Sequence, residues 1–189
     1  HKIGSIGKGI PGVTLEVLDS EGRPIRPGDH GEIVAQGANI MKGYYKDEAG
    51  TAEVLRDGRY HTGDLATIDE DGYIYIVGRS KDIIKSAGFR VSPNEVENVV
   101  CMAEGVQGCV VVGMPDQLIG EAIVAVIRPI TVMDRDEVRE RVMAVCNRLL
   151  PSYKVPRQVV FMDDFPLNSS NKVDKTKVRE MLTGEVGLT

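Results

Sequence analysis

Four short, largely hydrophobic runs mark the first 78 residues of the chain, at residues 13–18, 32–36, 65–68 and 73–77. Residues 13–18 alternate between hydrophobic and polar side chains, which is the period of a half-buried β-strand, and turn-forming Gly, Pro and Asp residues separate the runs. Asp47 is placed to cap one short helix that extends to Leu55. This pattern predicts a small, distorted antiparallel β-barrel.

The remaining residues mix strand and helix patterns. Residues 109–113 and 122–128 are continuous apolar runs rich in Val, which are typical of adjacent strands buried on both faces. Residues 158–162 predict a further strand. A sheet of about three strands with helices packed on it is therefore expected, and the chain as a whole falls in the α+β class.

Two helices in this second part have clear N-termini. The segment Ser92-Pro93-Asn94-Glu95 combines an N-cap, a proline at the first helical position and a capping-box glutamate, and it predicts a helix to about Ala103. Asp134 predicts the start of a helix that ends at Leu150. Its inner face is expected to carry Val138, Val142, Val145 and Leu149. Its arginines alternate with Asp and Glu, which indicates a solvated outer face rather than a phosphate site.

The distribution of charged residues divides the chain at the same position as the pattern of hydrophobic residues. Residues 1–78 carry 8 Lys and Arg against 13 Asp and Glu, whereas residues 79–189 carry 15 of each. Neither part has the basic balance of a nucleic-acid-binding domain. We therefore expect two domains, residues 1–78 and residues 79–189.

The three cysteines, Cys101, Cys109 and Cys146, show neither CxxC nor metal-ligand spacing. Because they lie on segments expected to face the core, we interpret them as reduced, packed thiols and predict a cytoplasmic protein. The longest apolar runs are too short to span a bilayer. The residue pattern predicts no metal site in this chain.

Asp64 is the first residue that suggests specific chemistry. It ends the segment Tyr60-His61-Thr62-Gly63-Asp64, where a carboxylate held at a loop edge can accept hydrogen bonds from two vicinal hydroxyl groups, as on a ribose. A turn residue that only caps its neighbours would look the same. His61 is expected to be an ordinary surface residue.

Three segments together resemble the adenylate-forming superfamily, and the acyl-CoA synthetases in particular. They are Tyr60-His61-Thr62-Gly63-Asp64, the stretch from Gly78 to Glu97, and Asn171-Lys172-Val173. The resemblance implies a β-barrel subdomain followed by a mobile α+β lid, with a hinge over residues 78–82. It also implies that the chain corresponds to only the last third or so of such an enzyme.

The resemblance implies roles for several residues. Asp64 and Arg79 would bind the ribose of ATP, and Lys81 would be the hinge. Lys85, Gly88 and Arg90 would belong to the strand that approaches CoA during thioester formation. For Gly88 two interpretations remain open, a turn that requires positive φ and a close backbone approach by the pantetheine arm.

Lys172 matches the catalytic lysine of the family, whose ammonium bridges the acyl carboxylate and the α-phosphate. A compact positive charge there would neutralise charge that builds on phosphorus in the transition state. Asn171 stands where the family usually has Gly. Asn tolerates the left-handed conformation better than other residues with a side chain, so the turn is expected to survive.

The implied activity is that of an AMP-forming acyl-CoA synthetase, with ATP and Mg bound mainly by a missing N-terminal domain and CoA as co-substrate. Its expected partners are a small carboxylic acid, ATP, CoA and that N-terminal domain, with no nucleic acid and no membrane span. The 189 residues alone are expected to be inactive. Two alternatives are an adenylation domain that loads a carrier protein and a stand-alone regulatory module. The run Ile83-Ile84-Lys85-Ser86-Ala87-Gly88 favours the CoA branch over the first.

Overall fold

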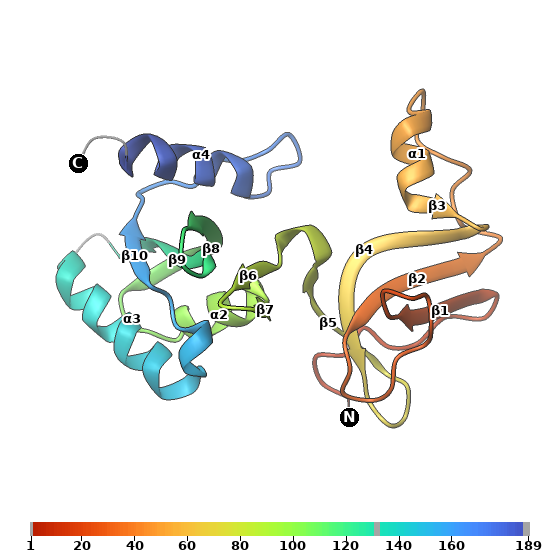
Figure 1. The fold of residues 1–189 in the computed structure, drawn as a ribbon, viewed down its shortest axis with the longest axis horizontal. Helices are drawn as coiled ribbons and strands as arrows, with labels where there is room; N and C mark the ends of the chain where they lie inside the picture. Colours follow the sequence, from red (N-terminus) through yellow and green to blue (C-terminus); the bar gives the residue numbers. More distant parts are fainter. Residues whose placement is uncertain (1, 131–132, 187–189) are drawn as a thin grey trace. The chain divides into compact units, whose positions relative to one another are not determined.

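The structure is a computed structural model that describes residues 2–130 and 133–186. The chain divides into two compact units, His1–Lys81 and Asp82–Thr189 (Figure 1). The boundary between them therefore falls three residues after the division predicted at residues 78 and 79, inside the segment 78–82.

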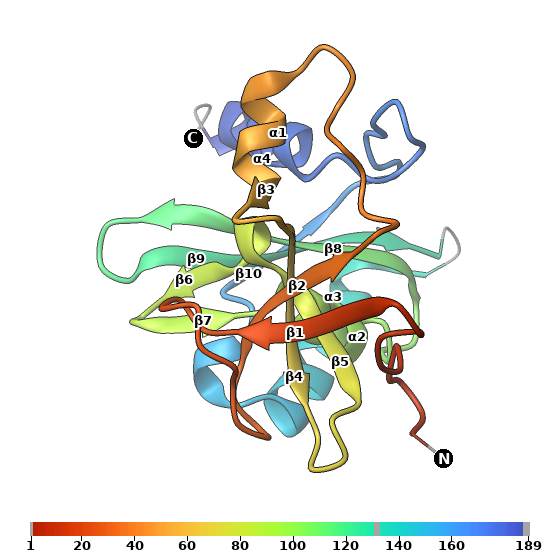
Figure 2. The same ribbon diagram turned by 90° about the vertical axis from the view of Figure 1, so that its right-hand side faces the viewer.

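Unit 1 is built on one antiparallel, curled sheet. Its strands are β1 (Val13–Leu18), β2 (Gly31–Gly37), β3 (Leu55–Arg56), β4 (Arg59–Ile68) and β5 (Ile74–Arg79). The order is β1-β2-β4-β3, and β5 pairs with β4. Figure 2 shows β1 crossing β4 and β5 at a steep angle as the sheet curls. The expected distorted barrel is thus a half-barrel, with Val17, Ile33, Ala66 and Ile74 in its core.

The strand β4 is longer than the sequence pattern predicts. We placed Tyr60-His61-Thr62-Gly63-Asp64 in a loop before a strand, but the segment lies inside β4. Gly63 has φ +72°, and the pairing with β2 shifts register between Glu32 and Val34. A β-bulge therefore breaks the alternation at this point, which hides the strand from a period-two pattern. The helix α1 (Glu48–Val54) follows Asp47, whose carboxylate accepts from the Gly50 amide as an N-cap.

Unit 2 contains one sheet, built from two long strands, one short strand and a small attached hairpin. The central strand β9 (Gly120–Pro129) pairs antiparallel with β8 (Val106–Asp116) and parallel with β10 (Gln158–Phe161). The hairpin of β6 (Ile84–Ser86) and β7 (Phe89–Val91) joins β9 through one pair, Ser86 with Gly120. The three expected strands are present, and the hairpin raises the number in the sheet to five.

Helices cover both faces of this sheet (Figure 1). One face packs on α2 (Pro93–Val100) and α3 (Arg135–Leu149), and its core includes Ile123, Ala125 and Ile127 of β9. The intervening Val124 and Val126 face the other core, with Val178 and Leu182 of α4 (Lys175–Val186). Burial on both faces explains why β8 and β9 have continuous apolar sequences instead of alternating ones.

Two expectations about buried side chains were wrong. Leu149 is 48 % exposed, and Cys146 takes its place on the inner face of α3 together with Val138 and Val142. Cys101 is exposed because it lies at the C-cap of α2, beyond the last turn that packs on the sheet. Cys109 is half-buried and Cys146 is buried, as predicted.

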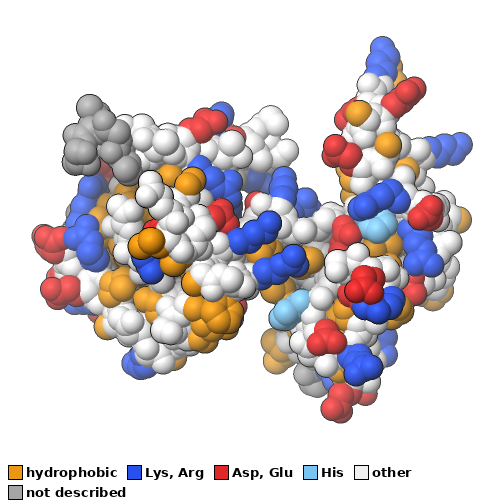
Figure 3. Space-filling model, in the orientation of Figure 1, with side chains coloured by type: hydrophobic (Ala, Val, Ile, Leu, Met, Phe, Trp, Pro, Cys, Tyr) orange, Lys and Arg blue, Asp and Glu red, His pale blue; other side chains and the backbone are white. Residues whose placement is uncertain are grey.

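Three arginines of α3 form ion pairs with acidic side chains, in agreement with the expected solvated outer face. Arg139 pairs with Asp136, and Arg141 pairs with Glu104. Positive and negative side chains are interspersed on the visible face of each unit (Figure 3). None of the helices in the described part of the chain is long and apolar enough to cross a membrane.

Candidate functional site

The bulge in β4 is held by a carboxylate that the sequence does not reveal. Glu32 of β2 accepts from the Gly63 amide at 3.0 Å through Oε1, and its Oε2 lies 2.9 Å from Nδ1 of His61. The Thr62 hydroxyl donates to the Ile33 carbonyl at 2.8 Å. His61 is only 20 % exposed, so the expectation of an ordinary surface residue was wrong. These contacts fix the backbone just before Asp64.

Asp64 and Arg79 lie side by side because they are cross-strand partners in β4 and β5. Arg79 Nε is 2.8 Å from Asp64 Oδ1, and the Asp64 amide donates a hydrogen bond to the Thr62 hydroxyl oxygen at 3.0 Å. The two side chains are 26 % and 53 % exposed. A carboxylate that is fixed on one side and open to solvent on the other can accept hydrogen bonds from a ligand.

A tyrosine pair lies close to this ion pair. The hydrogen bond to Tyr44 raises the pKa of Tyr60, and burial and the charge of Asp64 raise it further, while Arg79 lowers it. Tyr60 opens the segment that ends in Asp64, and Tyr44 comes from the loop before α1. Sequence reasoning singled out neither phenol, since a contact between positions 16 residues apart on a loop and a strand leaves no periodic signal.

The boundary between the units is a single 3-10 turn, Ser80–Asp82. Lys81 is exposed there. The turn follows Arg79 directly, so the ion-pair partner of Asp64 and the boundary between the units are adjacent in the chain.

The β6–β7 hairpin places two cations opposite each other. Lys85 and Arg90 are cross-strand neighbours in this hairpin, and both side chains are exposed. Among the described residues, neither of them forms an ion pair. The turn residues Ala87 and Gly88 have φ +50° and +83°, the conformation of a type I′ hairpin turn. Phe89 stacks on Tyr153 with ring centroids 4.1 Å apart. Two like charges on facing strands repel each other. An anion bound between them would offset this repulsion, so the hairpin is suited to bind one.

The loop that carries Lys172 is organised by an asparagine that the sequence reasoning missed. Oδ1 of Asn168 accepts from the Ser170 amide at 2.9 Å and from the Lys172 amide at 3.0 Å, and the Asn168 amide donates to the Lys172 carbonyl at 2.8 Å. Asn171 has φ +59°, the left-handed conformation that its sequence position predicted. Lys172 is exposed. Its backbone is therefore fixed while its ammonium is free to reach a ligand.

The helix that follows this loop is tied to the rest of unit 2 through Glu97. Its Oε1 accepts from Lys175 Nζ and from the Val111 amide, both at 2.8 Å. Glu97 and Lys175 are 19 % and 21 % exposed. Asp174 caps the same helix, accepting from the Thr176 amide at 3.1 Å. One carboxylate on α2 thus joins β8 to the start of α4.

The candidate residues fall in two groups. Asp64 and Arg79 belong to unit 1, while Lys85, Gly88, Arg90 and Lys172 belong to unit 2. Within the part of the chain that the structure describes, no cluster of three or more His, Cys, Asp or Glu is placed to hold a metal ion. The chemistry of these groups is that of binding hydroxyls and anions.

Two family profiles match this chain. The AMP-binding enzyme profile matches residues 1–45, and the AMP-binding enzyme C-terminal domain profile matches residues 95–172. Among curated proteins, feruloyl-CoA synthase from Amycolatopsis sp is 43 % identical over 181 residues, which are 95 % of this chain and 36 % of that protein. Long-chain-fatty-acid–CoA ligase from Salmonella typhimurium is 37 % identical, with 97 % and 32 % covered.

Solved structures agree with these relatives. ATP-bound MatB from Rhodopseudomonas palustris has a TM-score of 0.82 and 36 % identity, covering 94 % of this chain and 35 % of that chain. The o-succinylbenzoate CoA synthetase MenE from Bacillus subtilis, in complex with its acyl-adenylate, has a TM-score of 0.85 and 30 % identity, with 94 % and 36 % covered. The chain thus spans about a third of the length of the proteins it matches.

Proposed function

Because this chain belongs to the AMP-binding, or adenylate-forming, enzyme family of CoA ligases, we propose that it supplies the C-terminal portion of an AMP-forming acyl-CoA synthetase. In the first step a carboxylate oxygen attacks the α-phosphorus of ATP, and pyrophosphate leaves. In the second step the thiolate of CoA attacks the acyl carbon, and AMP leaves. The curated relatives are named for aromatic and aliphatic acids alike, so the proposed substrate class is a carboxylic acid.

The observation that carries this proposal is the pairing of Asp64 with Arg79. Arg79 holds Oδ1 of Asp64 at 2.8 Å, and the bulge fixes the Asp64 backbone. The carboxylate can then accept hydrogen bonds from both hydroxyls of a ribose, and the guanidinium can donate to the same nucleotide. We assign ribose binding to these two residues.

Lys172 is proposed as the catalytic residue of the adenylation step. None of the ion pairs among the described residues involves it, so its charge is not already neutralised. Negative charge builds on the oxygens around the α-phosphorus as the carboxylate attacks, and a lysine ammonium stabilises that charge. Asn168 and Asn171 set the backbone from which the ammonium reaches the reacting groups.

The β6–β7 hairpin is proposed to serve thioester formation. Lys85 and Arg90 offer two exposed cations, which suit the phosphates of CoA. A Cβ atom added at Gly88 would meet no atom within 4 Å, so the packing of the chain itself does not require a glycine there. Positive φ or a close approach by the pantetheine arm accounts for it.

A rotation about the turn at Lys81 would bring these groups to one active site in succession. Lys172 would be present during adenylation, and the hairpin would replace it for thioester formation. Conformational changes of this kind need only a few residues that absorb a change in φ and ψ. We propose ATP, with Mg held outside this chain, and CoA as the small molecules involved, and the cytoplasm as the location.

The test uses an enzyme that joins this chain to the remaining two thirds found in its relatives. Lys172→Ala should lower the rate of pyrophosphate release by at least ~100-fold, as expected when a charge that stabilises the transition state is removed. Lys177→Ala removes an exposed lysine from α4 and should leave the rate unchanged. Equal rates for wild type and Lys172→Ala would refute the assignment.

A second pair of variants separates the two interpretations of Gly88. Asn tolerates positive φ, so Gly88→Asn keeps the turn but adds a side chain. If only the turn matters, this variant forms thioester normally while Gly88→Val does not. If the pantetheine arm needs the space, both variants lose thioester formation and retain adenylation.

The 189 residues by themselves are proposed to be inactive, because the curated relatives are about three times as long. Incubating the chain with ATP, CoA and a panel of aliphatic and aromatic acids should yield no pyrophosphate. Release above the background of a heat-denatured sample would refute this part of the proposal.

A further inference from the structure

The β6–β7 hairpin is anchored at its base, and its turn lies near the surface of unit 2. Ile84 and Val91, the cross-strand pair at the base, are 1 % and 0 % exposed and belong to the core under α2 and α3. Lys85 and Arg90, the next pair toward the turn, are exposed. Packing in the core therefore fixes where the hairpin begins, but it does not fix the direction in which the exposed part points.

The turn of the longer β8–β9 hairpin lies next to this exposed part (Figure 2). Ser86 of β6 pairs with Gly120 of β9, and the Ala87 amide donates to the Ile119 carbonyl at 2.8 Å. The turn that supplies this carbonyl is itself held, because Oδ1 of Asp116 accepts from two of its amides, at 2.9 and 3.1 Å. Backbone atoms thus join the two turns.

Glu121, the second residue of β9, adds a side-chain contact to this connection. Its Oε2 accepts from the Lys85 amide at 2.6 Å. The carboxylate lies over Gly113 of β8, where an added Cβ atom would be 2.8 Å from Oε1 of Glu121. A side chain at position 113 would therefore displace the carboxylate. The Glu121 carboxylate thus fixes the strand β6 just before the turn at Ala87 and Gly88.

We propose that Glu121 is a positioning residue for thioester formation. Its role rests on the function proposed for the β6–β7 hairpin. Glu121 holds the Lys85 backbone, so that the hairpin presents its turn to CoA in one orientation. A displacement of about 1 Å in a reacting complex can slow the reaction ~100-fold. Adenylation is assigned to Lys172, on a different loop, and is expected to be independent of Glu121.

Two conservative variants separate the position of the acceptor from its charge. Glu121→Gln loses the charge but keeps an oxygen within reach of the Lys85 amide, so it should form thioester within ~3-fold of the wild-type rate. Glu121→Asp keeps the charge, but its carboxylate ends one methylene group short of the amide. This variant and Glu121→Ala should both form thioester at least ~10-fold more slowly than the wild type.

The assays use the enzyme that joins this chain to the remaining two thirds found in its relatives. Thioester formation is measured from a prepared acyl-adenylate at saturating CoA, and adenylation is measured as pyrophosphate release. Glu121→Ala and Glu121→Asp should release pyrophosphate at the wild-type rate, which also shows that they fold. Hydrogen exchange at the Lys85 amide should accelerate at least ~10-fold in these two variants, as expected for the loss of a charge-assisted hydrogen bond, and should change little in Glu121→Gln.

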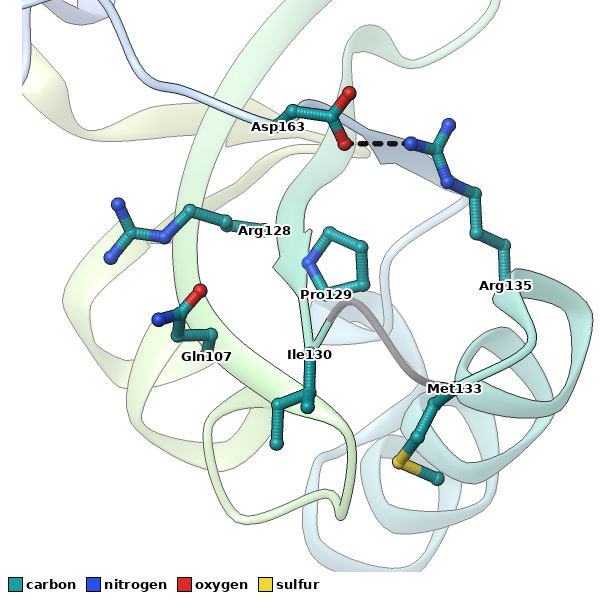
Figure 4. A pocket seen from close by; sticks show the side chains of 7 residues that line it. All are labelled: Gln107, Arg128, Pro129, Ile130, Met133, Arg135 and Asp163. Atoms are coloured by element: carbon teal, nitrogen blue, oxygen red, sulfur yellow. Dashed lines mark hydrogen bonds and ion pairs between the residues drawn. The ribbon is translucent and has the colours of Figure 1, made fainter.

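A matched control lies at the opposite end of the same sheet. Asp163 follows β10 and is 2.7 Å from Arg135, beside a small hollow that Arg128 also lines (Figure 4). Arg128 lies eight residues along β9 from Gly120, which corresponds to about 26 Å at ~3.3 Å per residue. Asp163→Ala removes a negative charge and an ion pair there, and should leave both half-reactions and exchange at the Lys85 amide unchanged.

The role of Glu121 is refuted if Glu121→Ala forms thioester at the wild-type rate while Gly88→Val does not. It is also refuted if Glu121→Ala loses adenylation as well, since Glu121 would then support the fold in general. Rescue by Asp and not by Gln would assign the effect to charge and would contradict the proposed role. A wild-type thioester rate in Gly88→Val would instead overturn the function proposed for the hairpin, and the role of Glu121 with it.

Discussion

Replacing Glu97 by alanine should destabilise unit 2 far more than replacing Glu95, although both glutamates lie on α2 only two residues apart. Glu97 Oε1 accepts from the Val111 amide and from Lys175 Nζ, both at 2.8 Å. Among the residues that the structure describes, the Glu95 carboxylate has a single partner, Lys154 Nζ at 2.7 Å, and the Glu95 side chain is 45 % exposed. These two glutamates on one short helix are therefore expected to differ in their contribution to the stability of unit 2.

The contacts give the expected magnitudes. Val111 is fully buried, and leaving its amide without an acceptor costs about 1–3 kcal/mol. The ion pair with Lys175 is about one fifth exposed and adds on the order of 1 kcal/mol after screening by solvent. Glu97→Ala should therefore cost about 2–4 kcal/mol in total. Glu95→Ala removes a surface ion pair and should cost at most about 1 kcal/mol.

Differential scanning calorimetry of the 189-residue chain measures this difference. For a unit of this size, 1 kcal/mol corresponds to roughly 4–8 °C in Tm, so Glu97→Ala should lower the Tm of unit 2 by at least ~8 °C. Hydrogen exchange at the Val111 amide should also accelerate in Glu97→Ala and not in Glu95→Ala. Equal Tm values for the two variants would refute the reasoning that Glu97 joins α2, β8 and α4.

Three smaller predictions follow from other contacts. Asn171→Ala should cost about 1 kcal/mol in urea unfolding because φ is +59°, while Asn171→Gly should not, and equal losses would contradict this. The Lys2 ammonium lowers the pKa of Asp69 from 3.8 to about 2. The ion pair therefore stabilises the folded chain fully above pH 4, and this stabilisation is lost as the pH falls to 2. Asp69→Asn should flatten that part of a Tm–pH curve. Exposed Cys101 should react with a thiol reagent before Cys109, whose pKa burial raises, and mass spectrometry that finds the reverse order would contradict this.

The sequence predicts those parts of the fold whose signal is local. The strand β1 follows from side-chain alternation, β8 and β9 follow from continuous apolar runs, and Asp47 and Asp134 cap the helices that they were expected to cap. The segment from Tyr60 to Asp64 was misplaced because a glycine with positive φ introduces a bulge, and the bulge breaks the period on which strand prediction depends.

Contacts between distant residues were beyond the reach of pattern reasoning. Glu32 lies 29 residues before His61, and Glu97 lies 78 residues before Lys175. Neither glutamate differs in its local sequence from one that faces solvent. The pairing of Asp64 with Arg79 was expected because a family resemblance placed both on a ribose, and the cross-strand register of β4 and β5 provides its physical basis.

The central claim is that Lys172 serves adenylation and has no part in thioester formation. The most direct test supplies the full enzyme with CoA and a chemically prepared acyl-adenylate, so that the first step is bypassed. Lys172→Ala should then form acyl-CoA at the wild-type rate, although it forms almost none from the free acid and ATP. A variant that is equally slow with the acyl-adenylate would contradict the claim and would assign Lys172 to both steps.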